Sequence, residues 1–212
     1  MFITLEGIEG SGKTTQIGRL VEYLEARQIE CVATRQPGGT PIGETIRSIL
    51  LDPANSALKP MTELLLYMAD RAQHIFELIK PCLEAGKTVV CDRYFDATLV
   101  YQGFARGLSI ELIGELHKLL FDDLKPDVTL LLDLSPQLGL GRAWQQLATG
   151  QRSDDESRFE AEKVAFHEKV RAGYLELARL EPDRFRIIDA DQTQDEVFAA
   201  ISKVVSSLLE QG

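Results

Sequence analysis

Hydrophobic and polar positions follow two alternating patterns along the chain, and these patterns predict strands separated by helices. Five short, mostly apolar runs predict buried strands, at residues 2–5, 30–35, 88–92, 128–134 and 185–188. Between the first two runs, apolar residues recur at helical spacing, at Ile17, Leu20, Val21 and Leu24. Alternation of this kind predicts an α/β fold with a parallel sheet covered by helices on both faces. Ligands of such a sheet gather at the carboxyl ends of its strands.

The later helices have clear start and stop signals. The longest predicted helix covers residues 61–85 and ends at Gly86, with one apolar stripe made of Leu64, Leu65, Met68, Ala72, Ile75, Ile79 and Leu83. An aromatic and polar turn is expected after residue 92, followed by helices over 109–121 and 159–180. Thr40-Pro41 and Ser135-Pro136 each place a capping hydroxyl before a proline, and Thr193 with Glu196 forms a capping box.

Residues 147–158 interrupt this pattern with a polar, irregular stretch that is too hydrophilic for a core. We expect this segment to be a short lid over a binding site. The length of 212 residues otherwise favours one domain over residues 1–212.

Charge and cysteine content narrow the possible partners. The formal net charge is −10, so a nucleic acid polymer or an acidic membrane would be repelled by the average field, whereas a small phosphate needs only a local basic cluster. The chain has no apolar run long enough for a membrane span, and a strand at residue 2 leaves no room for a leader, which favours the cytoplasm. Cys31, Cys82 and Cys91 lack metal spacing and are expected to be reduced core thiols.

The first predicted strand runs into a phosphate-binding loop. Residues 7–14 match G-x-x-x-x-G-K-[ST] at every fixed position, with Gly7, Ile8, Glu9, Gly10, Ser11, Gly12, Lys13 and Thr14. The glycines let backbone N–H groups surround phosphate oxygens, and the following helix N-terminus adds partial positive charge. Lys13 would reach the β- and γ-phosphates, and the Thr14 hydroxyl would bind a Mg²⁺ ion that bridges them. The loop alone predicts binding of a nucleoside triphosphate, not a reaction.

Two other predicted strands end in charged residues at the same sheet edge. The second strand ends at Arg35 and the third at Asp92, with Arg93 directly after it. Cations beside a magnesium-bound triphosphate suit phosphoryl transfer, in which the protein positions the substrates and neutralises charge. Asp92 would hold a water of the magnesium ion. Without the loop beside it, Arg93 would be read as a surface ion pair.

Longer motifs resemble one family over nearly the whole length. They are Leu5-Glu6-Gly7-Ile8-Glu9-Gly10-Ser11-Gly12-Lys13-Thr14-Thr15-Gln16, Thr34-Arg35-Gln36-Pro37-Gly38-Gly39-Thr40, Asp70-Arg71, and Asp92-Arg93-Tyr94 through Tyr101-Gln102-Gly103. The chain resembles the bacterial thymidylate kinases, which are P-loop nucleoside monophosphate kinases. This resemblance implies the P-loop NTPase fold with a five-stranded parallel sheet, a homodimer, and transfer of the γ-phosphoryl group of ATP to dTMP, which supplies dTTP synthesis.

The resemblance also implies roles for individual residues. Glu9 would approach the deoxyribose, Arg35 would grip the acceptor phosphate, and Arg93 would lie between donor and acceptor phosphates. Arg71 would hydrogen-bond thymine, which would stack on Tyr67 one turn earlier. Helical geometry agrees in part, because Tyr67 and Arg71 fall on the same side of the predicted helix, next to the apolar stripe. An arginine extending from a core edge into solvent is an equally good interpretation of the helix pattern alone.

Further roles follow from the same resemblance. Thr98 and Gln102 would complete the contacts to the base, and the Tyr101 ring would crowd the 2′ position of a ribonucleotide. On the donor side, Thr15 would extend the loop's contacts with ATP, and the Arg142 guanidinium would pack on adenine, although the local pattern alone favours a solvated helix face.

Catalytic charge is expected from the lid, since no variable position of the phosphate loop is cationic. Arg152 and Arg158 are the candidates, and we favour Arg152. Gln36, Ala97 and Ser157 depart from the family pattern, where glutamate, serine and aspartate are usual. His74, His117 and His167 lack metal spacing and are expected to be structural.

Two other functions remain open at the level of sequence. One is a kinase of another small acceptor, such as a different nucleoside monophosphate. The other is a nucleotide-dependent switch, but the chain lacks an N-K-x-D guanine-reading motif and a D-x-x-G motif after a strand.

Overall fold

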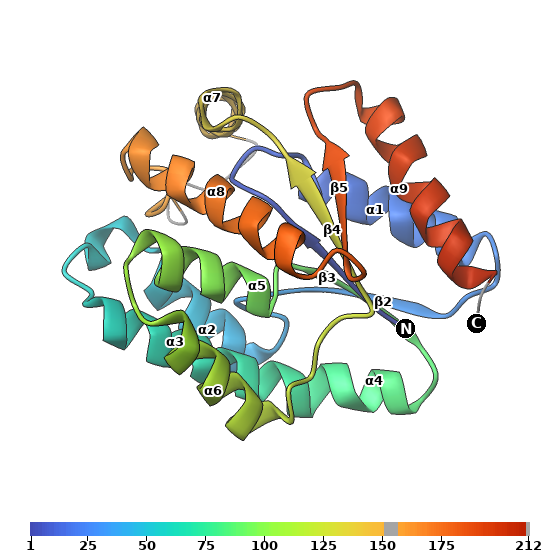
Figure 1. The fold of residues 1–212 in the computed structure, drawn as a ribbon, viewed down its shortest axis with the longest axis horizontal. Helices are drawn as coiled ribbons and strands as arrows, with labels where there is room; N and C mark the ends of the chain where they lie inside the picture. The colour runs from blue at the N-terminus through green and yellow to red at the C-terminus, as the bar shows by residue number, and fades with distance from the viewer. Residues whose placement is uncertain (151–156, 211–212) are drawn as a thin grey trace.

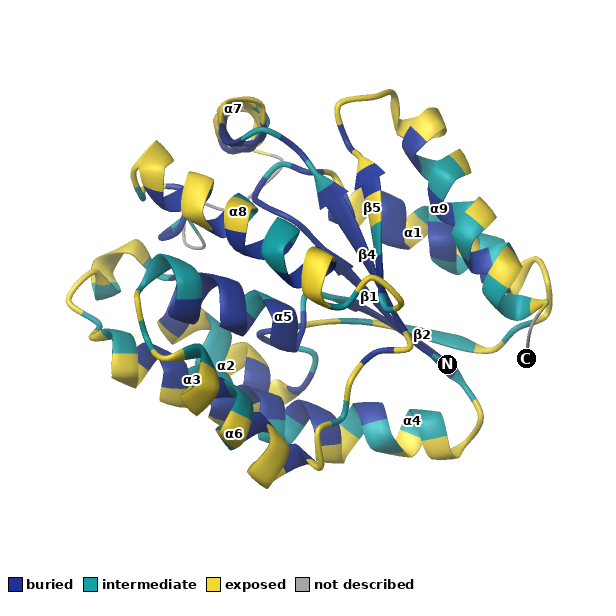
Figure 2. Cartoon of the chain, viewed as in Figure 1, coloured by how far each residue is buried: buried dark blue, intermediate teal, exposed yellow. Residues whose placement is uncertain are grey.

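A five-stranded parallel sheet forms the centre of the computed structural model, which describes residues 1–150 and 157–210. The strands are β1 (Phe2–Glu6), β2 (Cys31–Arg35), β3 (Thr88–Asp92), β4 (Val128–Asp133) and β5 (Phe185–Asp189), in the order β2-β3-β1-β4-β5. This is the P-loop NTPase fold, and the predicted parallel sheet is confirmed. The inner strands are almost fully buried, as expected where helices cover both faces of a parallel sheet (Figure 2).

Helices lie on both faces of the sheet (Figure 1). On one face α1 (Lys13–Glu25) packs against α9 (Gln194–Leu209), and both contact the strands. The other face carries α8 (Val164–Leu180) and the remaining helices, with α7 (Pro136–Ala148) at the upper end. The remaining helices are α2 (Pro41–Leu51), η1 (Pro53–Asn55), α3 (Pro60–His74), η2 (Ile75–Ile79), α4 (Lys80–Glu84), α5 (Phe95–Thr98), η3 (Leu99–Ala105) and α6 (Ile110–Phe121), of which η3 packs most closely on α8.

Helix starts follow the predicted capping chemistry in two of three places. Thr40 accepts a hydrogen bond from the Gly43 amide, and Thr193 forms a full capping box with Glu196. Ser135 precedes α7 as expected, with proline at the first position, but its side chain does not cap the helix.

The long helix predicted over 61–85 is divided. It consists of α3, a π-helical turn over Ile75–Ile79, and α4. Pro81 lies just beyond the wide turn, and its ring would clash with the carbonyl group four residues earlier in a regular helix. The prediction that Leu65 belongs to the core stripe is wrong, because Leu65 is 56 % exposed while Leu64 is fully buried.

Two further boundaries differ from the prediction. The expected turn after residue 92 is helical, as α5 and η3, and the polar side chains that suggested a turn are buried against the site. The helix expected from 159 begins only at Val164, because Phe159 and Glu160 turn inward and are buried. Residues 147 and 148 belong to α7, and the central part of the predicted lid lies outside the described residues.

The three cysteines are free thiols, as predicted, although only Cys91 is fully buried. Within residues 1–150 and 157–210, no helix is long and apolar enough to cross a membrane.

Candidate active site

A cavity of about 850 Å³ lies at the carboxyl ends of β1, β2 and β3. Lys13, Arg35, Arg71 and Arg93 all line it, and Arg47 does so too, so five cationic residues from separate elements border the same space. The sheet register explains this meeting, because Arg35 pairs with Asp92 and Leu5 pairs with Asp92 across adjacent parallel strands. The net charge of the chain is negative, but this cavity is locally basic.

The phosphate loop is folded around Lys13. Gly10 and Gly12 have φ angles of 72° and 94°, which side-chain-bearing residues rarely adopt. Lys13 Nζ donates to the carbonyl oxygens of Gly7 and Ile8, at 3.0 and 2.9 Å. Burial, together with nearby Arg93, lowers the pKa of Lys13 to about 8. A bound phosphate would favour the charged form of this lysine.

Arg93 crosses the cavity from the end of β3 to the loop. Its Nη1 donates to the Gly7 carbonyl oxygen at 2.8 Å, and its Nη2 donates to Glu9 Oε1 at 2.9 Å. The guanidinium carbon also lies 5.0 Å from the centre of the Tyr101 ring. Arg93 is therefore held beside the loop at a position that both phosphate groups could reach.

Glu9 is a buried carboxylate held by groups from three elements. Its Oε1 also accepts a hydrogen bond from the Tyr101 hydroxyl at 2.7 Å, and its Oε2 lies 3.1 Å from His167 Nδ1. Burial alone would raise the pKa of Glu9, but Arg93, with His167 and Lys13 behind it, holds that pKa well below its usual range. Glu9 is thus ionised at neutral pH.

Arg71 is completely buried in the cavity wall. Its Nε donates to Gln36 Oε1 at 2.8 Å, and its Nη2 donates to the Thr98 hydroxyl oxygen and, at 3.3 Å, to the Tyr94 carbonyl oxygen. An arginine only donates, so the amide oxygen of Gln36 must face Arg71 and the amide nitrogen must face the other way. That nitrogen lies 3.4 Å from His74 Nδ1.

His74 completes this chain of contacts. Burial and the neighbouring Arg71 lower its pKa to about 4, so the ring is neutral at pH 7. Because Gln36 donates to Nδ1, the ring proton lies on Nε2, which is 2.7 Å from the Thr34 hydroxyl oxygen. The prediction that His74 is structural is compatible with this chain, which holds Gln36 and Arg71 in place.

Arg35 is less constrained than the other cations. Its side chain is 47 % exposed and forms an ion pair with Glu44, with Nη2 and Oε2 2.8 Å apart. Glu44 Oε1 also accepts from the Gly39 amide at 3.1 Å. The half-open position leaves Arg35 able to turn toward an anionic ligand in the cavity.

The remaining predicted residues fall into two groups. Those that line the cavity with the cations are Glu9, Gly10, Gly12, Thr14, Thr15, Tyr67, Asp92, Thr98, Tyr101 and Gln102. Gly7, Ile8 and Ser11 are buried and do not line it. Arg142 does not line it either, since its Nη1 donates to the Ala190 carbonyl oxygen at 3.1 Å near Asp191.

Of the two candidate lid arginines, the structure describes only Arg158. Arg152 lies outside the described residues. Arg158 is 7 % exposed, contacts the Leu50 carbonyl oxygen, and forms an ion pair with buried Glu63 at 2.7 Å. This arrangement ties Arg158 to the fold, not to the cavity.

Comparison with known proteins decides which P-loop family this geometry belongs to. The family model described as thymidylate kinase matches residues 5–201. The chain belongs to the thymidylate kinase family. A thymidylate kinase from Desulfosudis oleivorans is 61 % identical over 190 residues, covering 90 % of this chain and 89 % of the relative. One from Syntrophotalea carbinolica is 53 % identical over 208 residues, covering 98 % and 96 %.

The same family appears among solved structures. The crystal structure of a thymidylate kinase from Ehrlichia chaffeensis matches with a TM-score of 0.76 and 34 % identity. That match covers 97 % of this chain and 98 % of the other. The resemblance seen in the sequence motifs to the thymidylate kinase family is therefore confirmed.

Two residues that do not line the cavity, but contact residues that do, had no role predicted from the sequence. Glu6 is fully buried at the end of β1, and Tyr174 in α8 donates its hydroxyl hydrogen to Glu6 Oε2 at 2.7 Å. Glu6 belongs to the family motif and is the last residue of an apolar strand. A carboxylate at the end of a buried strand could have indicated a role for it. No sequence pattern indicated a role for Tyr174, because its hydrogen-bond partner, Glu6, lies 168 residues away in the chain.

Proposed function

We propose a set of residue roles for the reaction of the thymidylate kinase family, which this chain carries out. The reaction moves the γ-phosphoryl group of ATP to dTMP and gives dTDP and ADP, a step in dTTP synthesis. Membership of the family shows the activity. The observation that carries the residue roles is the meeting of Lys13, Arg35, Arg71 and Arg93 around one cavity.

The acceptor is assigned to the part of the cavity between α3 and η3. Arg71 and Thr98, held together by a hydrogen bond, would bind the thymine carbonyl edge, with Gln102 beside them and Tyr67 as the stacking ring. Gln102 donates from Nε2 to Glu63 at 2.8 Å, which fixes the orientation of its amide. Arg35 would turn from Glu44 toward the acceptor phosphate.

The sugar is assigned to the space beside Glu9 and Tyr101. The hydrogen bond between these residues fixes the Tyr101 ring, which also packs edge-on against Phe159 at 5.3 Å between centroids. A ring held from two sides cannot move aside for a 2′-hydroxyl group. This rigidity supports selection of deoxyribonucleotides by exclusion.

The donor phosphates are assigned to the loop amides, Lys13, Thr14 and Thr15. Arg93 lies beside the loop and would neutralise charge on the phosphoryl group as it moves between the substrates. The acceptor phosphate is already anionic, so the reaction needs no general base. Arg152 would add charge and exclude water when the lid covers the site, and Arg142 would pack on adenine.

Magnesium is proposed as the cofactor, held by Thr14 and Asp92. Both residues line the cavity, and their oxygen donors suit this ion. Within the described residues, Asp92 Oδ1 is buried and accepts no hydrogen bond, which fits an oxygen whose partner is a cation or its water. Bound magnesium would screen the charge of the donor phosphates.

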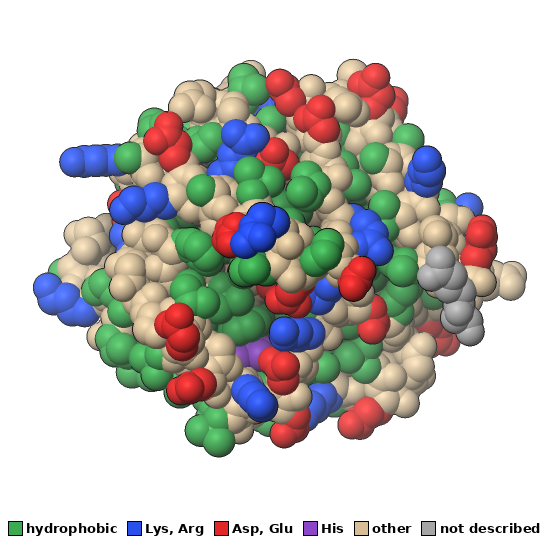
Figure 3. Space-filling view, viewed as in Figure 1, with side chains coloured by type: hydrophobic (Ala, Val, Ile, Leu, Met, Phe, Trp, Pro, Cys, Tyr) green, Lys and Arg blue, Asp and Glu red, His purple; other side chains and the backbone are tan. Residues whose placement is uncertain are grey.

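A homodimer is proposed from exposed apolar side chains on four neighbouring helical elements. Large exposed apolar side chains lie on α2, α3, η2 and α6, and Figure 3 shows apolar atoms gathering at the lower left over α3 and α6. They are Ile42, Ile49, Met61, Leu65, Phe76, Leu112, Leu119 and Leu120. Exposed apolar side chains gathered on neighbouring helices in this way favour a protein contact. Leu119, at 79 % exposure, lies on this surface.

The dimer is tested by measuring mass in solution. Leu119→Glu should give a monomer with an unchanged melting temperature, whereas Leu180→Glu, at an exposed position on α8, should leave the mass unchanged. A dimer that survives Leu119→Glu would place the contact elsewhere.

A cytoplasmic location remains a prediction, supported by the three free thiols.

The proposed substrate is tested by measuring ADP formation from ATP and magnesium with a panel of acceptors. Turnover should rise steeply with dTMP and little with AMP or CMP. Equal stimulation by all acceptors would mean a kinase of broader specificity. Hydrolysis that no monophosphate affects would favour a nucleotide-dependent switch.

A further inference from the structure

Arg93 has an unusual backbone conformation. Its φ angle is 64°, in the left-handed region that residues with a side chain rarely adopt. Hydrogen bonds hold the chain on both sides of this strained position. The Arg93 amide donates to the Leu5 carbonyl oxygen at 3.0 Å, and the next amide, of Tyr94, donates to Glu6 Oε1 at 2.8 Å. The Glu6 carboxylate therefore fixes the peptide that directly follows Arg93.

The second oxygen of Glu6 reaches the other end of the same arginine. Glu6 Oε2 accepts from the Tyr174 hydroxyl at 2.7 Å, and the Tyr174 oxygen accepts from Arg93 Nη1 at 3.2 Å. Arginine only donates, so the direction of this chain is fixed from Arg93 to Tyr174 to Glu6. Its last acceptor must be a carboxylate oxygen without a proton.

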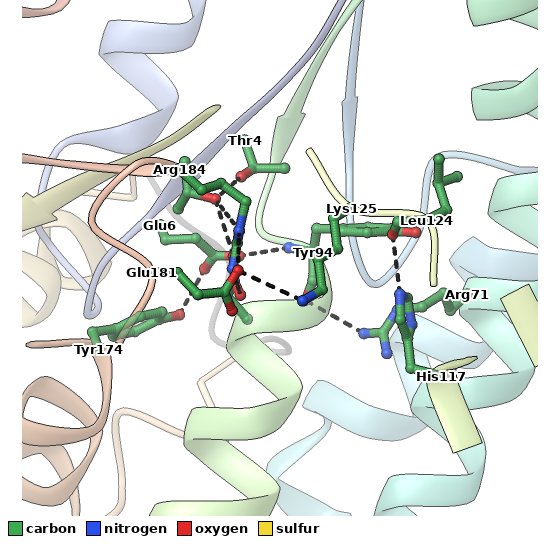
Figure 4. A network of polar contacts seen from close by, with 12 residues as sticks. Thr4, Glu6, Arg71, Tyr94, His117, Leu124, Lys125, Tyr174, Glu181 and Arg184 are labelled. Atoms are coloured by element: carbon green, nitrogen blue, oxygen red, sulfur yellow. Dashed lines mark hydrogen bonds and ion pairs between the residues drawn. The ribbon is translucent and has the colours of Figure 1, made fainter. Parts of the chain in front are cut away.

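Tyr94 extends the chain to a second cation. While its amide binds Glu6, its carbonyl oxygen accepts from Arg71 Nη2 at 3.3 Å. Figure 4 shows Glu6 between Tyr174 and Tyr94, with Arg71 beyond Tyr94. One fully buried carboxylate is thus connected to both arginines through two tyrosines from different elements.

We propose that the ionised carboxylate of Glu6 is a positioning residue that holds Arg93, and through Tyr94 also Arg71, for phosphoryl transfer to dTMP. This inference rests on the roles proposed above for the two arginines. Glu6 does not line the cavity and so acts through residues that do.

The charge state of Glu6 gives the proposal a measurable consequence. Burial, and then the charge of Asp96, raise the pKa of Glu6 to about 7. A protonated Glu6 would donate to the Tyr174 oxygen and compete with Arg93 for it, which reverses the chain. The groups that face Glu6 from packed elements are Asp96 in α5, Arg93 and Tyr94 after β3, Tyr174 in α8, Lys13, Arg71 and Cys91. The turnover number kcat should therefore fall below about pH 7.

Glu6→Gln is the direct test, because a glutamine amide imitates the protonated carboxyl group. Its oxygen can still accept from Tyr94, but its nitrogen donates to Tyr174. At pH 8 we expect kcat to fall about ten- to hundredfold, the range for losing one hydrogen bond to a charged group, with smaller changes in the KM values. The fall of kcat below pH 7 should disappear in this variant.

Tyr174→Phe is the matched variant, since it removes only the side-chain path to Arg93 and keeps the bond between Glu6 and Tyr94. We expect a smaller loss of kcat and a weaker acid fall, because the hydroxyl oxygen for which a protonated Glu6 competes with Arg93 is absent from this variant. Glu6→Gln should melt no lower than the wild type at pH 8, because it removes a buried charge. If it does not fold, an unchanged kcat in Tyr174→Phe would overturn the proposal.

Arg93→Ala separates this proposal from the one it rests on. If Arg93→Ala loses turnover while Glu6→Gln keeps wild-type kcat and its pH profile, the role of Glu6 is overturned and that of Arg93 stands. If Arg93→Ala itself keeps its turnover, the proposed role of Arg93 fails. Loss of kcat in both variants, with the acid fall absent from Glu6→Gln, supports both.

Discussion

Arg71 lies fully buried in the cavity wall, and its hydrogen-bond partners within the described residues are neutral groups of Gln36, Met68, Tyr94 and Thr98. Removing a guanidinium group from water costs several kcal/mol, and neutral partners repay this cost only in part. A ligand that offers an electron-rich carbonyl oxygen would repay more. At this scale, the proposed recognition of the acceptor base depends on a cation whose hydrogen bonds within the described residues go to neutral groups.

Arg71→Ala should therefore raise the KM for dTMP by about ten- to hundredfold, the range for losing a hydrogen bond to a charged group. The KM for ATP should change little, since the loop is untouched. Steady-state kinetics with each substrate varied in turn measures both values. An unchanged KM for dTMP would remove Arg71 from the base site.

Two elements are fitted together at the phosphate loop. A side-chain carbon at Gly139 in α7 would lie 2.5 Å from the Glu9 carbonyl oxygen, and one at Gly10 would lie 2.0 Å from the Gly139 carbonyl oxygen. The first turn of α7 thus packs directly on the loop. This contact makes α7 a support of the phosphate loop.

Gly139→Ala should push the loop away and raise the KM for ATP, with a cost in stability of about 1–3 kcal/mol, as for other overpacked sites. Gly141→Ala, two residues on in the same helix, has no atom within 4 Å of the added carbon. It should leave the KM for ATP unchanged and the stability equal or higher. Equal effects of the two substitutions would show that α7 does not support the loop.

The lid arginines give a second contrast between elements. Arg152→Ala should lower kcat far more than it weakens dTMP binding, with an unchanged melting temperature. Arg158→Ala should instead destabilise the fold by about 3–5 kcal/mol, because it leaves Glu63 buried without one of its partners. Unchanged turnover in Arg152→Ala would remove Arg152 from the catalytic role.

Helices and strands could be predicted from the sequence where their burial leaves a regular spacing of apolar and polar residues. All five strands are near their predicted places, because each is a short apolar run between loops. Residues 99–103 escaped prediction because both apolar and polar side chains there are buried, so no solvent-facing period remains. The strand order in the sheet and the chain from Arg93 to Glu6 depend on contacts between distant residues, which no local pattern carries.

Buried carboxyl groups make the stability of the folded protein depend on pH. Burial raises the pKa of Asp70 to about 7, and its Oδ2 has no hydrogen-bond partner within the described residues. A folded-state pKa above the unfolded value means that the folded protein binds more protons in this window. The contribution of Asp70 to stability is therefore lost as pH rises from about 4 to about 7.

Asp70→Asn removes this loss and keeps an oxygen to accept from the Gly38 amide. Its free energy of unfolding relative to the wild type should rise by about 1–3 kcal/mol between pH 5 and pH 8. Urea unfolding at both pH values measures the difference. A difference that is independent of pH would mean that Asp70 titrates normally in the folded state.

In the proposed arrangement, the molecule would hold two anionic substrates end to end in one cavity, one on the loop and Lys13, the other on Arg35, Arg71 and Arg93, which all line it. A compound that joins adenosine to thymidine through a chain of phosphates tests this arrangement most directly. We expect it to bind once per chain and to compete with both ATP and dTMP. Competition with only one of the two substrates would contradict a shared cavity.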